Sequence, residues 1–176
     1  MVLYNGIRSK ELQPIQPILG FKRTMDKINK LSELQEINVN YNRNYGKDKI
    51  TNSFRASEVC RQAFSSNEDN ICLKEYMYML LLNKANELIG WHKLSEGGVT
   101  GTTADVRIAF SIAVKCLASG MILCHNHPSD NTKPSQADIA LTKKFVEAGK
   151  ILDCTLLDHI ILSEDEFYSF ADEDLL

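Results

Sequence analysis

The segment on which the fold and chemistry of this chain depend reads Cys124-His125-Asn126-His127-Pro128-Ser129-Asp130-Asn131-Thr132-Lys133-Pro134-Ser135-Gln136-Ala137-Asp138. An apolar run, Met121-Ile122-Leu123, comes directly before it and predicts a short buried strand. Because side chains alternate between the two faces of a strand, His125 and His127 are expected to point the same way.

The end of this segment predicts the start of a helix. Ser135 stands where an N-cap belongs, and Asp138 follows three residues later, which is by itself an ordinary capping box with Asp in place of Glu or Gln. Apolar residues then recur at helical spacing: Ile139, Leu141, Phe145 and Val146. Two imidazoles from a strand end and one carboxylate from a helix start can also converge on one cation. That donor set leaves a tetrahedral Zn²⁺ one ligand short, at the position where water binds in hydrolytic sites.

Taken as one pattern, H-x-H-P, six residues and S-x-x-D resembles the metal signature of the JAMM (MPN+) metallopeptidases, with every fixed position filled. The letters HNHPS and PSQAD are similar to the RadC-like branch of that group. The resemblance implies that His125, His127 and Asp138 bind Zn²⁺. This chain departs from the RadC-like pattern at Asp130, where RadC-like chains commonly have Gly. If that position requires a positive φ, Asp is among the few tolerated substitutes.

Two other classes of metal enzyme share letters with this segment and are excluded. An HNH nuclease spreads its histidines over a ββα unit, whereas here they are two residues apart. Zinc deaminases require H-x-E and P-C-x-x-C. The five cysteines of this chain contain no C-x-x-C pair: Cys60, Cys72, Cys116, Cys124 and Cys154.

A second apolar run, Tyr76 to Leu82, predicts a central strand buried on both faces, which forms a hairpin with residues 87–94. A carboxylate just before such a strand, here Glu75, is usually a solvated flank. However, K-E-Y-M-Y-M-L-L-L-N resembles the first core strand of RadC-like chains. The resemblance implies that Glu75 is the general base beside the metal-bound water and that Ser135 hydrogen-bonds the oxyanion formed by attack on a carbonyl.

The remaining elements are read from caps and periodicity. We expect a helix capped by Ser57, a helix over 106–118 capped by Asp105 and ended by Gly120, and an end at Gly149 for the helix that begins at Ser135. Residues 151–157 and 159–162 are expected to form a last strand or strand pair, and Ser163-x-x-Glu166 predicts a short final helix. Asp158-His159-Ile160-Ile161 resembles an element of RadC-like chains; a satisfied polar pair within the sheet is favoured over a catalytic role.

This order of elements predicts a mixed α/β layer. The resemblance implies the cytidine-deaminase-like α/β/α sandwich of the MPN domain, with a mixed sheet. We predict two parts: an N-terminal basic extension over 1–55, with a helix at 24–35 and a strand at 37–45, and a RadC-like JAMM/MPN domain over 56–176. Residues 1–55 carry ten Lys/Arg and five Asp/Glu, whereas residues 56–176 carry ten and eighteen.

Composition bounds the class of protein. At 176 residues, with 44% hydrophobic and 24% charged residues, the chain suits a globular protein. Five cysteines without framework spacing indicate reduced thiols, so we expect a cytoplasmic setting without a signal peptide. No apolar run approaches the ~20 residues of a membrane helix, so no membrane association is expected.

The function predicted from these features is a zinc-dependent metallopeptidase acting on a peptide or isopeptide bond of a peptide or protein substrate. A non-catalytic metal-binding interaction module is the first alternative. A DNA-repair-associated RadC-like protein is the second, and only the basic extension supports nucleic-acid binding. The substrate and the oligomeric state cannot be predicted.

Overall fold

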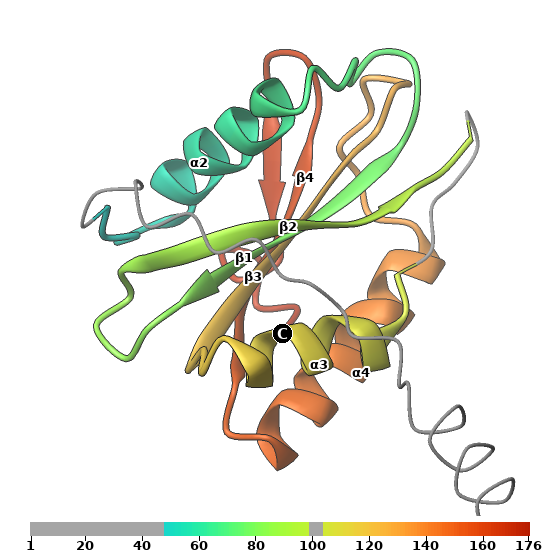
Figure 1. The fold of residues 1–176 in the computed structure, drawn as a ribbon. Helices are drawn as coiled ribbons and strands as arrows, with labels where there is room; N and C mark the ends of the chain where they lie inside the picture. Colours follow the sequence, from blue (N-terminus) through green and yellow to red (C-terminus); the bar gives the residue numbers. More distant parts are fainter. Residues whose placement is uncertain (1–47, 99–103) are drawn as a thin grey trace, which may run out of the picture. The chain divides into compact units, whose positions relative to one another are not determined.

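The computed structural model describes residues 48–98 and 104–176, which belong to one compact unit of the chain. Its centre is a five-stranded mixed sheet with the strand order β2-β1-β3-β4-β5 (Figure 1). The described elements are α2 (Ser53–Ser66), β1 (Tyr76–Leu82), β2 (Leu88–Glu96), α3 (Val106–Lys115), β3 (Gly120–Asn126), α4 (Gln136–Ile151), β4 (Thr155–Leu162) and β5 (Phe167–Ser169). The predicted α/β class with a mixed sheet is therefore confirmed, whereas the helix predicted at 24–35 and the strand predicted at 37–45 lie outside the described residues.

The central strands combine antiparallel and parallel pairing. β1 runs antiparallel to both β2 and β3, so the predicted hairpin of β1 and β2 is present. β3 and β4 are parallel, and α4 is the crossover between them, as parallel pairing requires. β1 and β3 are buried over their whole length because both of their faces are covered.

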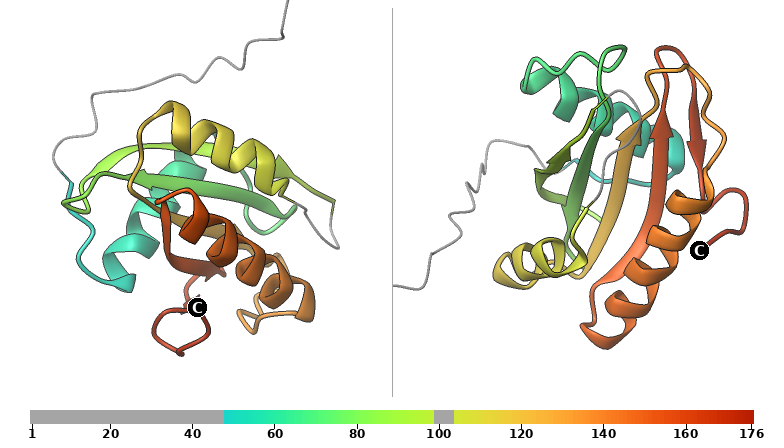
Figure 2. Two further views of the ribbon diagram at one scale, coloured as in Figure 1. Left: turned by 90° about the horizontal axis from the view of Figure 1, so that it is seen from below. Right: turned by 90° about the vertical axis from the view of Figure 1, so that its right-hand side faces the viewer.

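Helices cover the two faces of the sheet separately. α2 lies on one side, and α3 and α4 lie together on the other (Figures 1 and 2). Alternate residues of β1 pack against the helices on opposite faces of the sheet. Tyr78 contacts Phe64 of α2 with ring centroids 4.5 Å apart, whereas Met79 belongs to the core beneath α3 and α4. Among the described helices, none combines the length and the apolar character needed to span a membrane.

The two ends of the described domain differ from the sequence prediction. α2 begins at Ser53, and its N-cap is Asn52, whose side chain accepts from the backbone N–H of Arg55 at 2.7 Å. The predicted cap, Ser57, is instead a buried residue inside the helix. The predicted final helix is the strand β5, because Ser163 and the residues after it form a tight turn back onto β4 rather than a helical turn.

The ends of the two other helices are also shifted. Asp105 is the N-cap of α3 as predicted, but the chain leaves the helix after Lys115 and turns at Leu117, which has φ 54°. Gly120 is the first residue of β3. α4 continues through Gly149 to Ile151, and of the strand or strand pair expected after it the structure has the single strand β4.

Candidate metal centre

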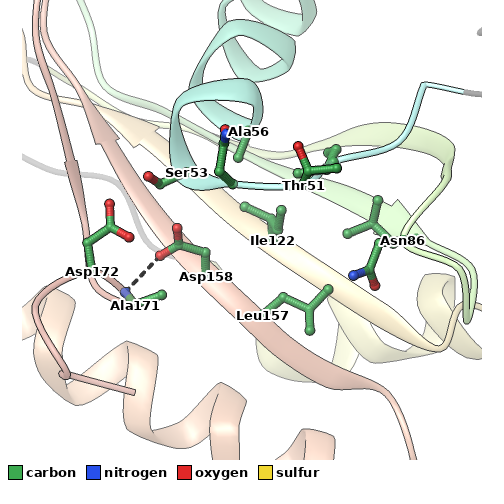
Figure 3. Close-up of a pocket in the computed structure, with 12 residues that line it drawn as sticks. Thr51, Ser53, Ala56, Asn86, Ile122, Leu157, Asp158, Ala171 and Asp172 are labelled. Carbon is green, nitrogen blue, oxygen red and sulfur yellow. Dashed lines mark hydrogen bonds between the residues drawn. The ribbon is translucent and has the colours of Figure 1, made fainter.

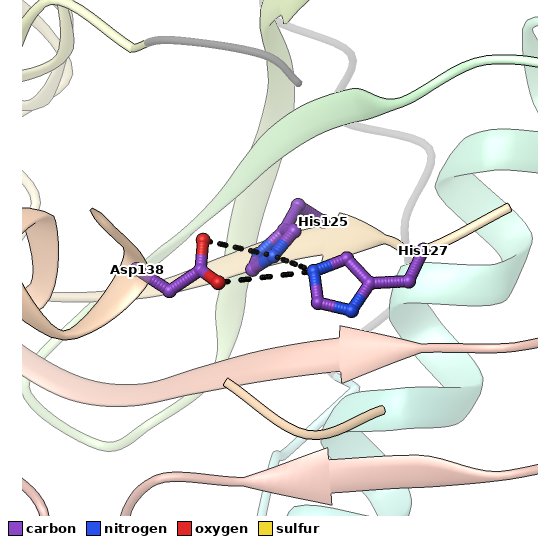
Figure 4. Close-up of side chains that lie close together, drawn as sticks. All are labelled: His125, His127 and Asp138. Atoms are coloured by element: carbon purple, nitrogen blue, oxygen red, sulfur yellow. Dashed lines mark hydrogen bonds and ion pairs between the residues drawn. The ribbon is translucent and has the colours of Figure 1, made fainter. Parts of the chain in front are cut away.

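Three side chains converge where β3 ends and α4 begins. His125 is the penultimate residue of β3, His127 follows the strand, and Asp138 lies in the first turn of α4 (Figure 4). Nε2 of His125 lies 3.0 Å from Nε2 of His127 and 3.3 Å from Oδ1 of Asp138. Nε2 of His127 lies 3.8 Å from Oδ2 of Asp138. The strand alternation thus directs both imidazoles to one point, as the sequence predicts.

The separations between these atoms fit a tetrahedral metal. Ligands about 2.0–2.2 Å from Zn²⁺ at the tetrahedral angle are about 3.3–3.5 Å from one another. The separations of His125 Nε2 from His127 Nε2 and from Asp138 Oδ1, 3.0 and 3.3 Å, lie near that value, whereas His127 Nε2 lies 3.8 Å from the other carboxylate oxygen, Oδ2. Nδ1 of His127 lies 2.6 Å from the carbonyl oxygen of Asn131, which can only accept a hydrogen bond. Nδ1 therefore donates, and Nε2 of a neutral His127 offers a lone pair. The donor set is therefore suited to a cation, and three protein ligands leave one tetrahedral position open.

The helix start fixes the carboxylate. Ser135 and Asp138 form the predicted capping box: Asp138 N–H donates to Ser135 Oγ at 3.2 Å, and Ser135 N–H donates to Asp138 Oδ2 at 2.7 Å. The Ser135 hydroxyl donates to the same oxygen at 2.6 Å, so Oδ1 is left facing His125. Burial raises the pKa of Asp138, but the hydrogen bond and charge of His125 and the bonds from Ser135 outweigh it and hold that pKa well below its usual value.

Glu75 is not a member of the converging triad. It directly precedes β1, whose Met77 is paired with His125 in the antiparallel ladder. Glu75 and Met77 are two residues apart, and Met77 packs in the core beneath α3 and α4, so alternation puts Glu75 on that same face. The backbone of Glu75 is hydrogen-bonded to the two residues that follow β2: Gly97 N–H donates to Glu75 O at 2.8 Å, and Glu75 N–H donates to Gly98 O at 3.2 Å.

The sequence analysis connected none of three buried polar residues with this region. Asn126, between the two histidines, is fully buried and hydrogen-bonds the segment that carries Glu75. His159 and Thr142 are also fully buried, and Nε2 of His159 lies 2.8 Å from Nδ1 of His125. Burial lowers the pKa of His159 well below its usual value, and the charge of His125 lowers it further. The only sequence signal for His159 was the D-H-I-I resemblance.

The predicted polar pair of Asp158 and His159 is satisfied, but its members face opposite sides of the sheet. Asp158 accepts from His159 N–H at 2.7 Å, Ser169 Oγ at 2.7 Å and Ala171 N–H at 3.0 Å. It lines a pocket of about 280 Å³ on the face that α2 covers (Figure 3). This pocket contains none of the five predicted site residues.

Asp130 adopts the conformation that its place in the pattern suggested. Its φ is 63°, in the left-handed region, where Asp is tolerated better than most residues. Its Oδ1 also accepts from the backbone N–H of Glu164 at 3.2 Å, and its N–H donates to His127 O at 3.1 Å. The loop between the histidines and α4 is therefore tied to the turn after β4.

Comparison of the sequence with known proteins identifies the family of this chain. The model of the RadC-like JAB domain matches residues 50–175. A UPF0758 protein of Flavobacterium johnsoniae is 48% identical over 101 residues, 57% of this chain and 44% of that protein. UPF0758 proteins of Porphyromonas gingivalis (47% over 104 residues; 58% and 46%) and Clostridium perfringens (31% over 132 residues; 70% and 58%) are also similar. The chain spans about half the length of these curated relatives, and their names state no activity.

Proposed function

The chain belongs to the RadC-like JAB domain family, and from this premise we propose that it is a zinc-dependent metallopeptidase that hydrolyses a peptide or isopeptide bond. The observation that carries the proposal is the convergence of His125, His127 and Asp138, each of which offers one ligand atom within 4.8 Å of the other two. Two imidazoles and a carboxylate are a ligand set that catalytic zinc sites use. Bound there, Zn²⁺ would polarise a carbonyl and lower the pKa of a coordinated water from ~15.7 to about 7.

In this proposal Glu75 is the general base. Its place on the face of His125, next to the strand that pairs with β3, supports a carboxylate that borders the centre without ligating. Among the described residues, the Glu75 side chain makes no hydrogen bond or ion pair, so no neighbour holds its oxygens away from a water. It would take a proton from the attacking water and pass it to the leaving amine.

Ser135 is the proposed oxyanion donor. Its side chain is exposed, and its single hydroxyl proton is directed at Asp138 Oδ2. A rotation about the Cα–Cβ bond would let the same hydroxyl donate to the oxygen of a tetrahedral adduct. One such donor typically contributes about 3–4 kcal/mol to transition-state stabilisation.

The two alternatives, a non-catalytic metal-binding module and a DNA-binding protein, predict different site residues and a different salt dependence. A binding module has no use for a free carboxylate beside an open ligand position. DNA binding would weaken steeply with salt. The region over 56–176 carries an excess of acidic residues, which does not favour contact with phosphates.

The first test is zinc content. We expect about one equivalent of zinc in the purified wild-type protein and a loss of it in His127→Ala, because three protein ligands are needed for a stable site. Hydrolysis of a peptide library would follow, with Glu75→Gln as the control that keeps size and removes the base. Zinc-loaded protein in which Glu75→Gln cleaves as fast as wild type would contradict the assigned mechanism. Wild-type protein without zinc would contradict the proposal as a whole.

A further inference from the structure

Two polar residues continue the contacts of His125 away from the centre. Nδ1 of His125 lies 2.8 Å from Nε2 of His159 on β4, and Nδ1 of His159 lies 2.7 Å from Oγ1 of Thr142 on α4. The Thr142 hydroxyl lies 2.7 Å from the backbone carbonyl oxygen of Asp138, one helical turn earlier. A continuous chain of contacts therefore runs from one candidate ligand to the helical turn that carries another.

The direction of each hydrogen bond follows from the last member of this chain. A carbonyl oxygen can only accept, so the one proton of the Thr142 hydroxyl points at Asp138 and its lone pairs face His159. Nδ1 of His159 must then donate, and since a neutral imidazole carries one N–H, its Nε2 accepts. Nδ1 of His125 therefore donates to His159, which leaves Nε2 of His125 with a lone pair.

The surroundings of His159 hold its ring in place. The ring is fully buried and stacks on Phe170 with centroids 4.7 Å apart and an interplanar angle of 15°. The N–H of Phe170 also donates to the carbonyl of His159 at 3.1 Å. Within residues 48–98 and 104–176 no carboxylate hydrogen-bonds this ring, so its two nitrogens are held by His125 and Thr142 alone.

We propose that His159 and Thr142 are positioning residues of the metal centre, which hold His125 in the one tautomer and orientation that presents its Nε2 lone pair beside His127 and Asp138. The inference rests on the proposed function, because it assigns these residues a role toward zinc. A metal-bound histidine is often backed by a carboxylate, which increases its basicity. A neutral imidazole adds no charge, so here the effect is on orientation. Through Thr142 the same chain ties the ring of His125 to the start of α4.

The test compares Thr142→Val with Thr142→Ser. Valine keeps the shape of threonine without the hydroxyl, so the Nδ1 proton of His159 loses its acceptor and the ring can take the other tautomer. That tautomer would donate to Nδ1 of His125 and move the proton of His125 to Nε2. We expect Thr142→Val to bind zinc about 10–100-fold more weakly than wild type in competition with a chromophoric chelator, and Thr142→Ser to stay within about threefold.

A second measurement reads the tautomers directly. In two-bond ¹H–¹⁵N spectra of the wild-type protein, we expect the proton of His159 on Nδ1. In Thr142→Val a fraction of His159 should carry its proton on Nε2. A role in packing alone would leave this signal unchanged.

Three outcomes would overturn the inference: zinc affinity of Thr142→Val equal to wild type, equal losses in the valine and serine variants, or a proton on Nε2 rather than Nδ1 of His159 in the wild type. If Thr142→Val does not fold, His159→Gln and His159→Leu give the same comparison, because Gln can still accept from His125. Wild-type protein that binds no zinc would instead remove the proposed function, a result distinct from zinc binding that ignores Thr142.

Discussion

The side-chain oxygen of Asn126 accepts the backbone N–H of Tyr76 at 2.8 Å, at the point where the ladder between β1 and β3 ends. The amide nitrogen of Asn126 donates to the carbonyls of Ile71 and Lys74, both at 2.7 Å. The residue between the two histidines thus binds Lys74 and Tyr76, the neighbours of Glu75 on both sides. One side chain links the strand of the candidate ligands to the segment of the candidate base.

Asn126→Ala should therefore lower the free energy of unfolding, by about 3 kcal/mol, because one buried and two partly buried backbone groups lose their partner. Asn126→Asp has the same shape but cannot donate, and its carboxylate would face the carbonyls of Ile71 and Lys74, so it should be destabilising as well. Urea unfolding measures both. A loss below about 0.5 kcal/mol in either variant, the range of ordinary surface substitutions, would contradict the structural role of Asn126.

Gly149 gives a prediction that runs against helix propensity. A Cβ at this position would lie 2.5 Å from the backbone oxygen of Cys154, because the chain turns back closely over the end of α4. Gly→Ala inside a helix normally stabilises by about 1 kcal/mol. Here we expect Gly149→Ala to destabilise by about 2 kcal/mol through overpacking.

Gly90→Ala is the control for this effect, since a Cβ at Gly90 meets nothing within 4 Å. We expect it to change the free energy of unfolding by less than about 0.5 kcal/mol. Thermal or urea unfolding of the two variants compares them. Equal stabilities of the two variants would show that the contact with Cys154 relaxes without cost.

The glycine also explains part of the difference between sequence and structure. A glycine near the end of a periodic segment predicts a helix terminus, and nothing local distinguishes Gly149, which is required by a contact with Cys154 across a tight turn. Ser57 and Asn52 are both good caps ahead of the same apolar residues, and packing on the sheet decides between them. Local rules therefore placed most of the elements but not all of their ends, and they assigned the last strand, β5, as a helix.

The triad could be predicted because its geometry is local. Strand alternation aligns His125 with His127, and a capping box sets Asp138 at the start of a helix. His159 and Asn126 could not be predicted in the same way. Their roles depend on the parallel pairing of β3 with β4 and on the segment before β1, 34 and 50 residues away in sequence from their partners.

Asp130 allows backbone strain to be separated from hydrogen bonding. Asp130→Gly loses the bond to Glu164 N–H but relieves the positive φ of 63°, whereas Asp130→Ala loses the bond and keeps the strain. We expect the alanine variant to be less stable than the glycine variant by about 1 kcal/mol. Urea unfolding of both variants measures this difference, and an alanine variant as stable as the glycine variant would contradict it.

The buried carboxylate of Asp158 predicts a pH dependence of stability. Burial raises the pKa of Asp158 above 3.8, and the charge of Asp172 acts in the same direction, although the bonds from Ser169, Ala171 and His159 oppose them. An acid with a raised pKa in the folded state stabilises that state most when protonated. Its contribution is full below 3.8 and is lost as the pH rises through the raised pKa.

Asp158→Asn removes this titration and keeps the side-chain shape. The stability of wild type minus that of Asp158→Asn should therefore be largest near pH 4 and should fall as the pH rises toward 7. Urea unfolding of both proteins across this range gives the difference, in which the titration of distant groups cancels. A difference that grows with pH would mean that the three donors to Asp158 outweigh its burial.

Ser135 caps α4 and is also the proposed oxyanion donor, and a pair of variants separates these two roles. Its Oγ accepts from the N–H of Asp138 as the helix cap, and its hydroxyl is the proposed oxyanion donor. Ser135→Ala removes both and should lower the free energy of unfolding by about 1 kcal/mol. Ser135→Gly keeps most of the N-cap stability, within about 0.5 kcal/mol of wild type, and has no side-chain donor. If the hydroxyl stabilises the oxyanion, both variants should lose about 10²–10³-fold in kcat on a cleaved peptide. A glycine variant that cleaves as fast as wild type would mean that Ser135 only caps α4.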